Sequence, residues 1–131
     1  MNSDAEQYGA IVDALVGEMC ERSLATNSVK LRFETADEPG GRQYIWIDPP
    51  WVFLSNGQEV TTSRDYHDDT FEEWSTLFEP LNQTTFTDWG IDGEGSTVFR
   101  FNGGYAIALP AVADERESGG WYLRWYARDA T

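Results

Sequence analysis

Lysine, histidine and cysteine are scarce in this chain. Lys30 is the single lysine, His67 the single histidine and Cys20 the single cysteine among 131 residues. A lone cysteine cannot form an internal disulfide, which is typical of a reducing compartment. Asp65, His67 and Asp69 alternate along the chain, but acids spaced so loosely before a helix are more typical of caps and solvated loops than of a metal site. We therefore expect no metal ion.

Long apolar runs are absent as well. No window of about 18 apolar residues occurs, so the sequence predicts no membrane-spanning helix and no membrane partner. Residues 1–9 contain no basic stretch followed by an apolar one, so we expect no signal peptide. Together with the unpaired cysteine, these features favour a cytoplasmic protein.

Motifs for catalysis and cofactor binding are also missing. No serine lies in a G-x-S-x-G or S-x-x-K motif, and no P-loop or dinucleotide fingerprint occurs. Gly93-Glu94-Gly95 and Gly103-Gly104 are more typical of hairpin turns than of phosphate-binding loops. Glu18 and Glu21 lie close to Cys20 and disfavour a reactive thiolate. The sequence therefore predicts a protein that is not an enzyme and that needs no cofactor.

Acidic residues dominate what is present. The chain has 23 Asp and Glu against nine Lys and Arg, which gives a formal net charge of −14. Direct nucleic-acid binding is disfavoured, because phosphate contacts need Lys and Arg. So large a surplus repels itself and costs stability. Two explanations are open. Either the charge serves a surface that binds a basic partner, or it reflects a GC-rich genome or a salt-rich habitat, which would also explain eight arginines beside one lysine.

Aromatic residues are plentiful, at 15% of the chain, and hydrophobic residues make up 40%. Disordered acidic chains lack such residues, because they cannot bury enough apolar surface to offset the entropy of ordering. At this length the chain can build one hydrophobic core. We expect a single folded domain that spans residues 1–131.

Two segments have helical periodicity. Apolar residues recur every three to four positions from Ser3 to about Ala25, and Asn27 follows the expected last turn. Ser3 and Glu6 have the spacing of a capping box. A second helix is expected from 70 to about 78, with a capping box that Thr70 begins. Its expected buried stripe comprises Phe71, Trp74, Leu77 and Phe78.

The rest of the chain is predicted to form strands joined by short turns. Val29, Leu31 and Phe33 alternate with polar residues, and Asn56-Gly57 is a strong hairpin signal. The expected strands are 29–34, 42–48, 51–55, 58–63, 85–91, 96–101, 105–109 and 121–126, with turns or loops at 36–41, 92–95, 102–104 and 114–120. Short turns favour antiparallel pairing. The expected class is α+β, with an N-terminal helix and one central helix packed on a mainly antiparallel, hairpin-connected β-sheet.

Acidic residues mix with aromatic ones in two places, which together form the candidate partner-binding surface. The candidate residues are Asp65, Tyr66, Asp68, Asp69, Glu72, Glu73, Asp88, Trp89, Asp92 and Glu94. Carboxylates can steer a basic protein toward such a surface, and aromatic side chains can anchor it. The same pattern is also typical of a solvated helix start and a polar turn, since helix starts favour acidic residues.

The tryptophans divide into two groups. Trp46, Trp74, Trp121 and Trp125 lie in patterned elements and are expected in the core. Trp51 follows two prolines and Trp89 neighbours acidic residues. These two are expected to be more exposed than the others.

Three motifs carry a resemblance to a known group of proteins. Pro49-Pro50-Trp51 leads into a strand, the Asn-Gly hairpin ends in Thr-Thr-Ser at 61–63, and Phe-x-Phe-Asn-Gly-Gly at 99–104 precedes a Trp-rich final strand. With these motifs, the stretch 48–126 resembles small bacterial domains found among the immunity proteins of polymorphic-toxin systems. The resemblance implies a non-enzymatic protein that binds and silences one partner, and it carries over no catalytic residue.

These features lead to two hypotheses. The preferred one is an inhibitor or immunity-type protein that neutralises a basic partner, such as a nuclease toxin or a nucleic-acid-binding defence complex; a close relative of this function is an anti-defence protein that mimics the charge of DNA. The alternative is a small-ligand-binding domain or small enzyme with a pocket lined by Trp and Tyr. Acids clustered on one face would favour the first, and an open aromatic pocket the second.

Overall fold

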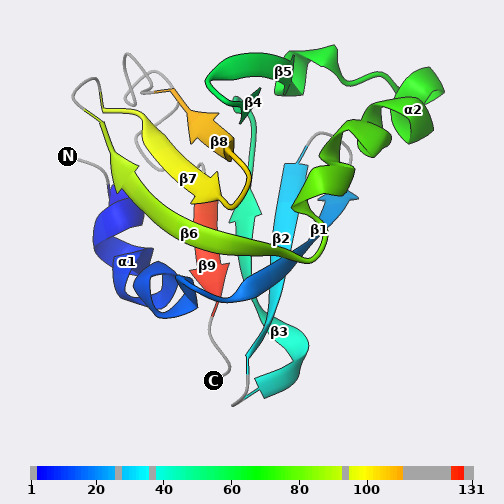
Figure 1. Cartoon of the computed structure of the whole chain (residues 1–131). Helices are drawn as coiled ribbons and strands as arrows, with labels where there is room; N and C mark the ends of the chain where they lie inside the picture. The colour runs from blue at the N-terminus through cyan, green and yellow to red at the C-terminus, as the bar shows by residue number, and fades with distance from the viewer. Residues whose placement is uncertain (1–2, 26–27, 36–37, 93–94, 111–124, 129–131) are drawn as a thin grey trace.

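The fold is built on a single antiparallel sheet (Figure 1). The computed structural model describes residues 3–25, 28–35, 38–92, 95–110 and 125–128, which form nine strands, two α-helices and three 3-10 helices. The strands are β1 (Met19–Ala25), β2 (Ser28–Thr35), β3 (Glu38–Ile47), β4 (Val52–Ser55), β5 (Gln58–Thr62), β6 (Thr84–Ile91), β7 (Thr97–Phe101), β8 (Tyr105–Leu109) and β9 (Trp125–Arg128). The helices are α1 (Ser3–Leu15), η1 (Ser63–Asp65), η2 (Asp68–Thr70), α2 (Phe71–Ser75) and η3 (Thr76–Leu81). The predicted α+β class with a mainly antiparallel sheet is confirmed.

The sheet curls back on itself. Its strand order is β5-β4-β8-β7-β6-β1-β2-β3-β9, so β3 and β4 lie six positions apart although only residues 48–51 join them. An extended chain of this length reaches about 18 Å, whereas six strand spacings in a flat sheet would measure about 29 Å. The two ends of the sheet must therefore approach each other, and the concave face between them holds the core.

Alternation along the strands selects which side chains enter that core. Val29, Leu31 and Phe33 of β2 are all fully buried, as their period-two pattern predicts. The same core cluster includes Leu15 of α1 and Phe78 of η3. Both helical parts therefore pack on the concave face, where α1 contacts β6 and β9 and η3 contacts β1 (Figure 1).

Helix α1 is shorter than its periodicity predicts. It ends at Leu15, and Met19–Ala25 forms strand β1 instead, with Cys20 paired to Phe33. The cause lies at Gly17, whose φ of 92° is left-handed and whose N–H donates to the carbonyl of Phe86 at 2.7 Å. The expected helix to about Ala25 was wrong because glycine ends the helix and pairing with β2 takes over.

The predicted hairpins are confirmed. Asn56 and Gly57 both have positive φ, 51° and 83°, as a type I′ turn between β4 and β5 requires. Antiparallel pairs also join β6 to β7 and β7 to β8. One expected loop was wrong: β3 begins at Glu38, so 38–41 belong to a strand that pairs with β2.

The tryptophans are distributed differently from the expectation. Trp51 is only 1% exposed and stacks on Trp74, so its expected exposure was wrong. Trp74 is buried as predicted, whereas Trp46 is half-buried on the convex face of the sheet rather than in the core. Trp89 is half-buried.

Several expectations fall outside the described parts of the chain. These are the side chains of Ser3 and Glu6, the cap at Asn27, the loop at 114–120, the start of the last strand at 121–124 and the side chain of Trp125. Within the described parts, no helix has the length and apolar character needed to cross a bilayer.

Candidate functional site

The first acidic stretch lies in a helical segment between β5 and β6, residues 63–81, which we call the lobe (Figure 1). It consists of η1, η2, α2 and η3 rather than the single helix expected over 70–78. Thr70 makes no side-chain cap, and Leu77 is 40% exposed, so both expectations were wrong. The reason is that α2 is one short turn, and the tighter 3-10 turns around it rotate Leu77 out of the buried stripe.

Aromatic stacking fixes the lobe to the sheet. The Trp74 ring lies 5.9 Å from that of Trp51 and 5.2 Å from that of Phe78, and Phe78 stacks on Phe53 at 5.0 Å. All four rings are buried in the core. Such pairs contribute about 0.5–1.5 kcal/mol each beyond the apolar area they bury. The lobe is therefore a rigid extension of the core.

A chain of hydrogen bonds begins the lobe. The Trp74 indole N–H donates to the Thr61 hydroxyl at 3.0 Å, and that hydroxyl donates to Asp65 at 2.9 Å. Asp65 also accepts the backbone N–H of Thr62 at 2.9 Å, while the Thr62 side chain caps η1 in return. The backbone N–H of Thr62, followed by the Thr61 hydroxyl, lowers the pKa of Asp65 below its usual value. The predicted site residue Asp65 thus holds the lobe in place.

The other carboxylates of the lobe point to solvent. Asp69, Glu72 and Glu73 are exposed, and no salt bridge joins any of them to a described residue. Asp68 accepts the Tyr66 hydroxyl, and this hydrogen bond raises the pKa of Tyr66. Arg64 lies at the start of the lobe and Arg22 pairs with Glu79 at its end, but no described cation forms an ion pair with Asp69, Glu72 or Glu73. These three acids therefore concentrate negative potential between the two ends.

Two aromatic side chains lie among these carboxylates. Tyr66 and Phe71 are half-buried, and their rings lie 6.0 Å apart. Both also contact the buried Trp74 ring, at 5.5 and 6.2 Å. The lobe therefore presents anchored rings beside unpaired acids, which is the arrangement predicted for a docking surface.

The sequence did not indicate how the end of the lobe is held. Arg22 of β1 forms an ion pair with Glu79 of η3, and the Arg22 backbone N–H donates to the Asn82 side chain at 3.1 Å. The Cys20 thiol donates to the carbonyl of Leu81 at 3.5 Å. Arg22 is a lone cation in a strand that was expected to be helical, so no sequence signal linked it to Glu79.

The second predicted cluster has different surroundings. Asp88 pairs with Arg100 at 2.8 Å, and the Asp92 carboxylate accepts the Ser96 N–H at 3.0 Å within its hairpin. The Trp89 indole donates to Asp13 of α1 at 2.7 Å, which joins that helix to β6. Glu94 lies outside the described residues. Strand β6 separates the lobe from Asp92 by about 27 Å, so the structure does not bring the two clusters together.

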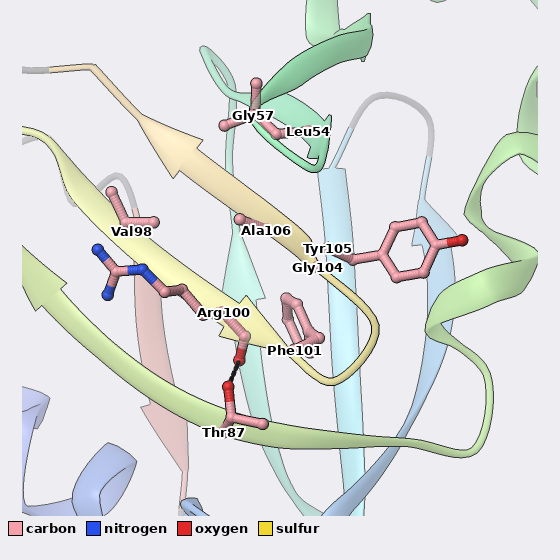
Figure 2. A pocket seen from close by; sticks show the side chains of 9 residues that line it. All are labelled: Leu54, Gly57, Thr87, Val98, Arg100, Phe101, Gly104, Tyr105 and Ala106. Carbon is pink, nitrogen blue, oxygen red and sulfur yellow. Dashed lines mark hydrogen bonds between the residues drawn. The ribbon is translucent and has the colours of Figure 1, made fainter.

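A shallow hollow lies on the convex face of the sheet. Figure 2 shows its lining from β4, β6, β7 and β8 and the turns between them. Its volume is about 340 Å³. The lining residues are Leu54, Gly57, Thr87, Val98, Arg100, Phe101, Gly104, Tyr105 and Ala106. Among the described residues its lining includes no tryptophan and one cation, Arg100, which already pairs with Asp88.

Two further chemistries receive no support from the geometry. Burial raises the pKa of the Cys20 thiol to about 12, so this cysteine stays protonated at neutral pH. In the parts of the chain that the structure describes, no three His, Cys, Asp or Glu side chains converge as metal ligands would.

Comparisons with known proteins add no family to this geometry. No family model matches the chain, and neither the curated proteins nor the solved structures contain a match. The resemblance to immunity proteins stays a prediction from the sequence motifs.

Proposed function

We propose that this chain is a non-enzymatic, immunity-type inhibitor that binds a basic protein through the acidic face of the lobe. The observation that carries the proposal is the set of exposed carboxylates, Asp69, Glu72 and Glu73, which no described cation neutralises. Because the lobe is already anchored to the core, binding orders little additional chain and loses little entropy. Unpaired charges on a rigid surface attract an oppositely charged partner.

The partner proposed is a nuclease toxin or a nucleic-acid-binding defence complex in the cytoplasm. Proteins of this kind carry basic surfaces, because they must contact phosphate. The lobe offers such a surface negative charge in place of a phosphate backbone. Tyr66 and Phe71, which are half-buried on the same lobe, add apolar aromatic area of the kind that hot-spot residues provide.

Charge reversal with a matched control tests this proposal. An immunity protein is usually encoded next to its toxin, so the partner used in the test is the nuclease encoded beside this chain's gene. Asp69→Lys with Glu72→Lys should slow association with that nuclease and weaken the salt dependence of the rate, since both carboxylates steer the encounter. Glu18→Lys with Glu59→Lys changes the net charge by the same amount outside the lobe, at two acids that no described salt bridge uses. Surface plasmon resonance over a range of salt concentrations provides the rates.

The two variants separate a local from a global effect of charge. The proposal requires that the lobe variant lose at least about tenfold in association rate while the control stays near wild type. Equal losses for both variants would show that only total charge matters. An unchanged rate for the lobe variant would place the interface elsewhere.

A second candidate function is small-ligand binding at the convex hollow. The hollow's volume of about 340 Å³ is at the small end of ligand sites. An apolar dye with a single sulfonate, such as anilinonaphthalene sulfonate, should bind there with increased fluorescence, and Ala106→Leu should fill the space and abolish the signal. No fluorescence change with the wild-type protein would remove this candidate.

A further inference from the structure

The convex face of β1, β2 and β3 carries basic and aromatic side chains, although the chain as a whole is strongly acidic. Residues paired across antiparallel strands point to the same face, and those next to them along the strand point to the other. The core-facing pairs are Cys20 with Phe33 and Leu31 with Ile45, so the intervening rows point outward. Those rows, which we call the outer face, are Glu21–Arg32–Tyr44 and Ser23–Lys30–Trp46.

Two cations on the outer face are available to a partner. The ammonium of Lys30, the single lysine, lies 4.4 Å from the centroid of the Tyr44 ring, and no described carboxylate forms a salt bridge with it. Arg32 is 45% exposed and contacts Glu21 at 3.3 Å, a long and solvated ion pair. Such pairs contribute little and exchange readily for a better one.

Trp46 gives the outer face an ordered aromatic surface. Its indole N–H donates to Asp48 at 2.7 Å, and the same carboxylate oxygen accepts the Ser28 hydroxyl at 2.8 Å. The indole is therefore held in one orientation while remaining only half-buried. The outer face therefore combines ordered aromatic area with one exposed cation, Arg32, and one half-buried cation, Lys30, a combination suited to an anionic partner.

The lobe and the outer face of one molecule cannot contact each other, because they lie on opposite faces of the sheet. Trp74 and Phe78 insert the lobe into the core cluster on the concave face, whereas Lys30 and Arg32 point away from that cluster. The protein thus carries an unpaired acidic surface and a cationic, aromatic one on opposite faces of its sheet. Because every molecule carries one lobe and one outer face, each outer face in solution has the lobes of other copies available to it at the concentration of the protein itself.

We propose that the outer face docks the lobe of a second copy of this chain. The contact pairs Lys30 and Arg32 of one copy with the Asp69–Glu73 region of the next. It is heterologous, since each molecule uses two different surfaces, so each docked copy still presents one free lobe and one free outer face. Growth is therefore open-ended and reversible, and it competes with a basic partner for the lobe without requiring that such a partner exist.

Salt should affect this assembly in both directions. At about 10 mM salt the screening length is about 30 Å, and the net charge of −14 on every copy drives the molecules apart. At about 1 M the screening length is about 3 Å, and the local attraction between lobe and outer face is lost. Association is therefore strongest near about 150 mM. There the screening length is about 8 Å, so the repulsion between distant charges is screened while the attraction between groups in contact is retained.

Sedimentation velocity of the full chain tests the proposal, with far-UV circular dichroism as a check on folding. Between about 10 and 500 µM at the intermediate salt, the wild type should show a mean mass that rises with concentration. Lys30→Glu with Arg32→Glu, which damages the outer face, should weaken association at least about tenfold, as should Asp69→Lys with Glu72→Lys, which damages the lobe. The Glu18→Lys, Glu59→Lys control should still associate.

Mixing the two damaged variants gives the decisive result. The outer-face variant retains a lobe and the lobe variant retains an outer face, so an equimolar mixture should form dimers that stop growing, because the remaining two surfaces are both damaged. A wild type that stays monomeric at all three salt concentrations overturns the proposal, and so does a mixture that stays monomeric while the wild type associates. Binding of a single-stranded oligonucleotide to a monomeric wild type, lost with Lys30→Glu and Arg32→Glu, would assign the outer face to nucleic acid instead.

Discussion

Gly17 ends helix α1 by its conformation and not by lack of space. Its φ is 92°, and a Cβ added there would meet no atom within 4 Å. Gly17→Ala should therefore cost about 1–2 kcal/mol of unfolding free energy, because an alanine strains in the left-handed region. Gly90→Ala is the matched control: it also has open space but no left-handed φ. Urea unfolding of both variants measures the difference, and equal stabilities would contradict a conformational role.

Asp65 makes the stability of the lobe depend on pH. Hydrogen bonds from Thr62 and Thr61 lower its pKa below the usual 3.8, so its contribution is complete above that value and is lost as the pH falls through the lowered pKa. Asp65→Asn should destabilise the protein by about 0.5 kcal/mol at neutral pH, a small effect because the group is solvated. The difference from wild type should disappear once the pH falls below that lowered pKa.

Asp69→Asn provides the control for that titration. Asp69 is exposed and its carboxylate accepts no hydrogen bond from a described residue, so Asp69→Asn removes one carboxylate of the lobe without breaking a contact that holds the lobe. Urea titrations at a series of pH values compare the three proteins. A gap between wild type and Asp65→Asn that stays constant with pH would show that the carboxylate charge is irrelevant to the cap.

At the scale of elements, one buried indole N–H adds a hydrogen bond to the aromatic contacts that hold the lobe. Trp74→Phe keeps the aromatic stack but removes the donor to Thr61, which should cost about 1 kcal/mol and raise amide exchange in residues 71–78 about fivefold. Leu77→Ala is the control on the same segment, since Leu77 is 40% exposed. Exchange measured by mass spectrometry should show no local increase for this control. Similar increases in both variants would mean that the lobe is loosely held in any case.

Strands and turns could be predicted from the sequence because their signals are local. Val29, Leu31 and Phe33 alternate, and Asn56-Gly57 specifies its own turn, so neither needs distant information. Helix ends were predicted poorly, since period 3.6 continues past Gly17 while the actual boundary depends on pairing with β2 and on Phe86. A short run of apolar residues fits either element, and tertiary contacts decide between them.

The candidate site could be predicted in part for the same reason. The mixture of acids and aromatics in 65–73 was visible in sequence, and the structure places those residues on one lobe. The ion pair between Arg22 and Glu79 joins residues 57 positions apart, and no local pattern encodes it. Trp51 was expected to be exposed because of its proline neighbours, whereas its burial follows from the curl of the whole sheet.

At the scale of the whole molecule, salt dependence separates the two origins of the −14 charge. Screening should raise the Tm, because it weakens repulsion in the folded state more than in the expanded one. If the lobe concentrates acids for binding, Asp69→Lys with Glu72→Lys should raise the unfolding free energy at low salt by about 0.5–1 kcal/mol, a gain that vanishes at high salt. Glu18→Lys with Glu59→Lys, which relieves the same total charge elsewhere, should gain less. Equal gains, measured by calorimetry at two salt concentrations, would mean that the acids of the lobe are no more crowded than the rest and that the charge reflects composition alone.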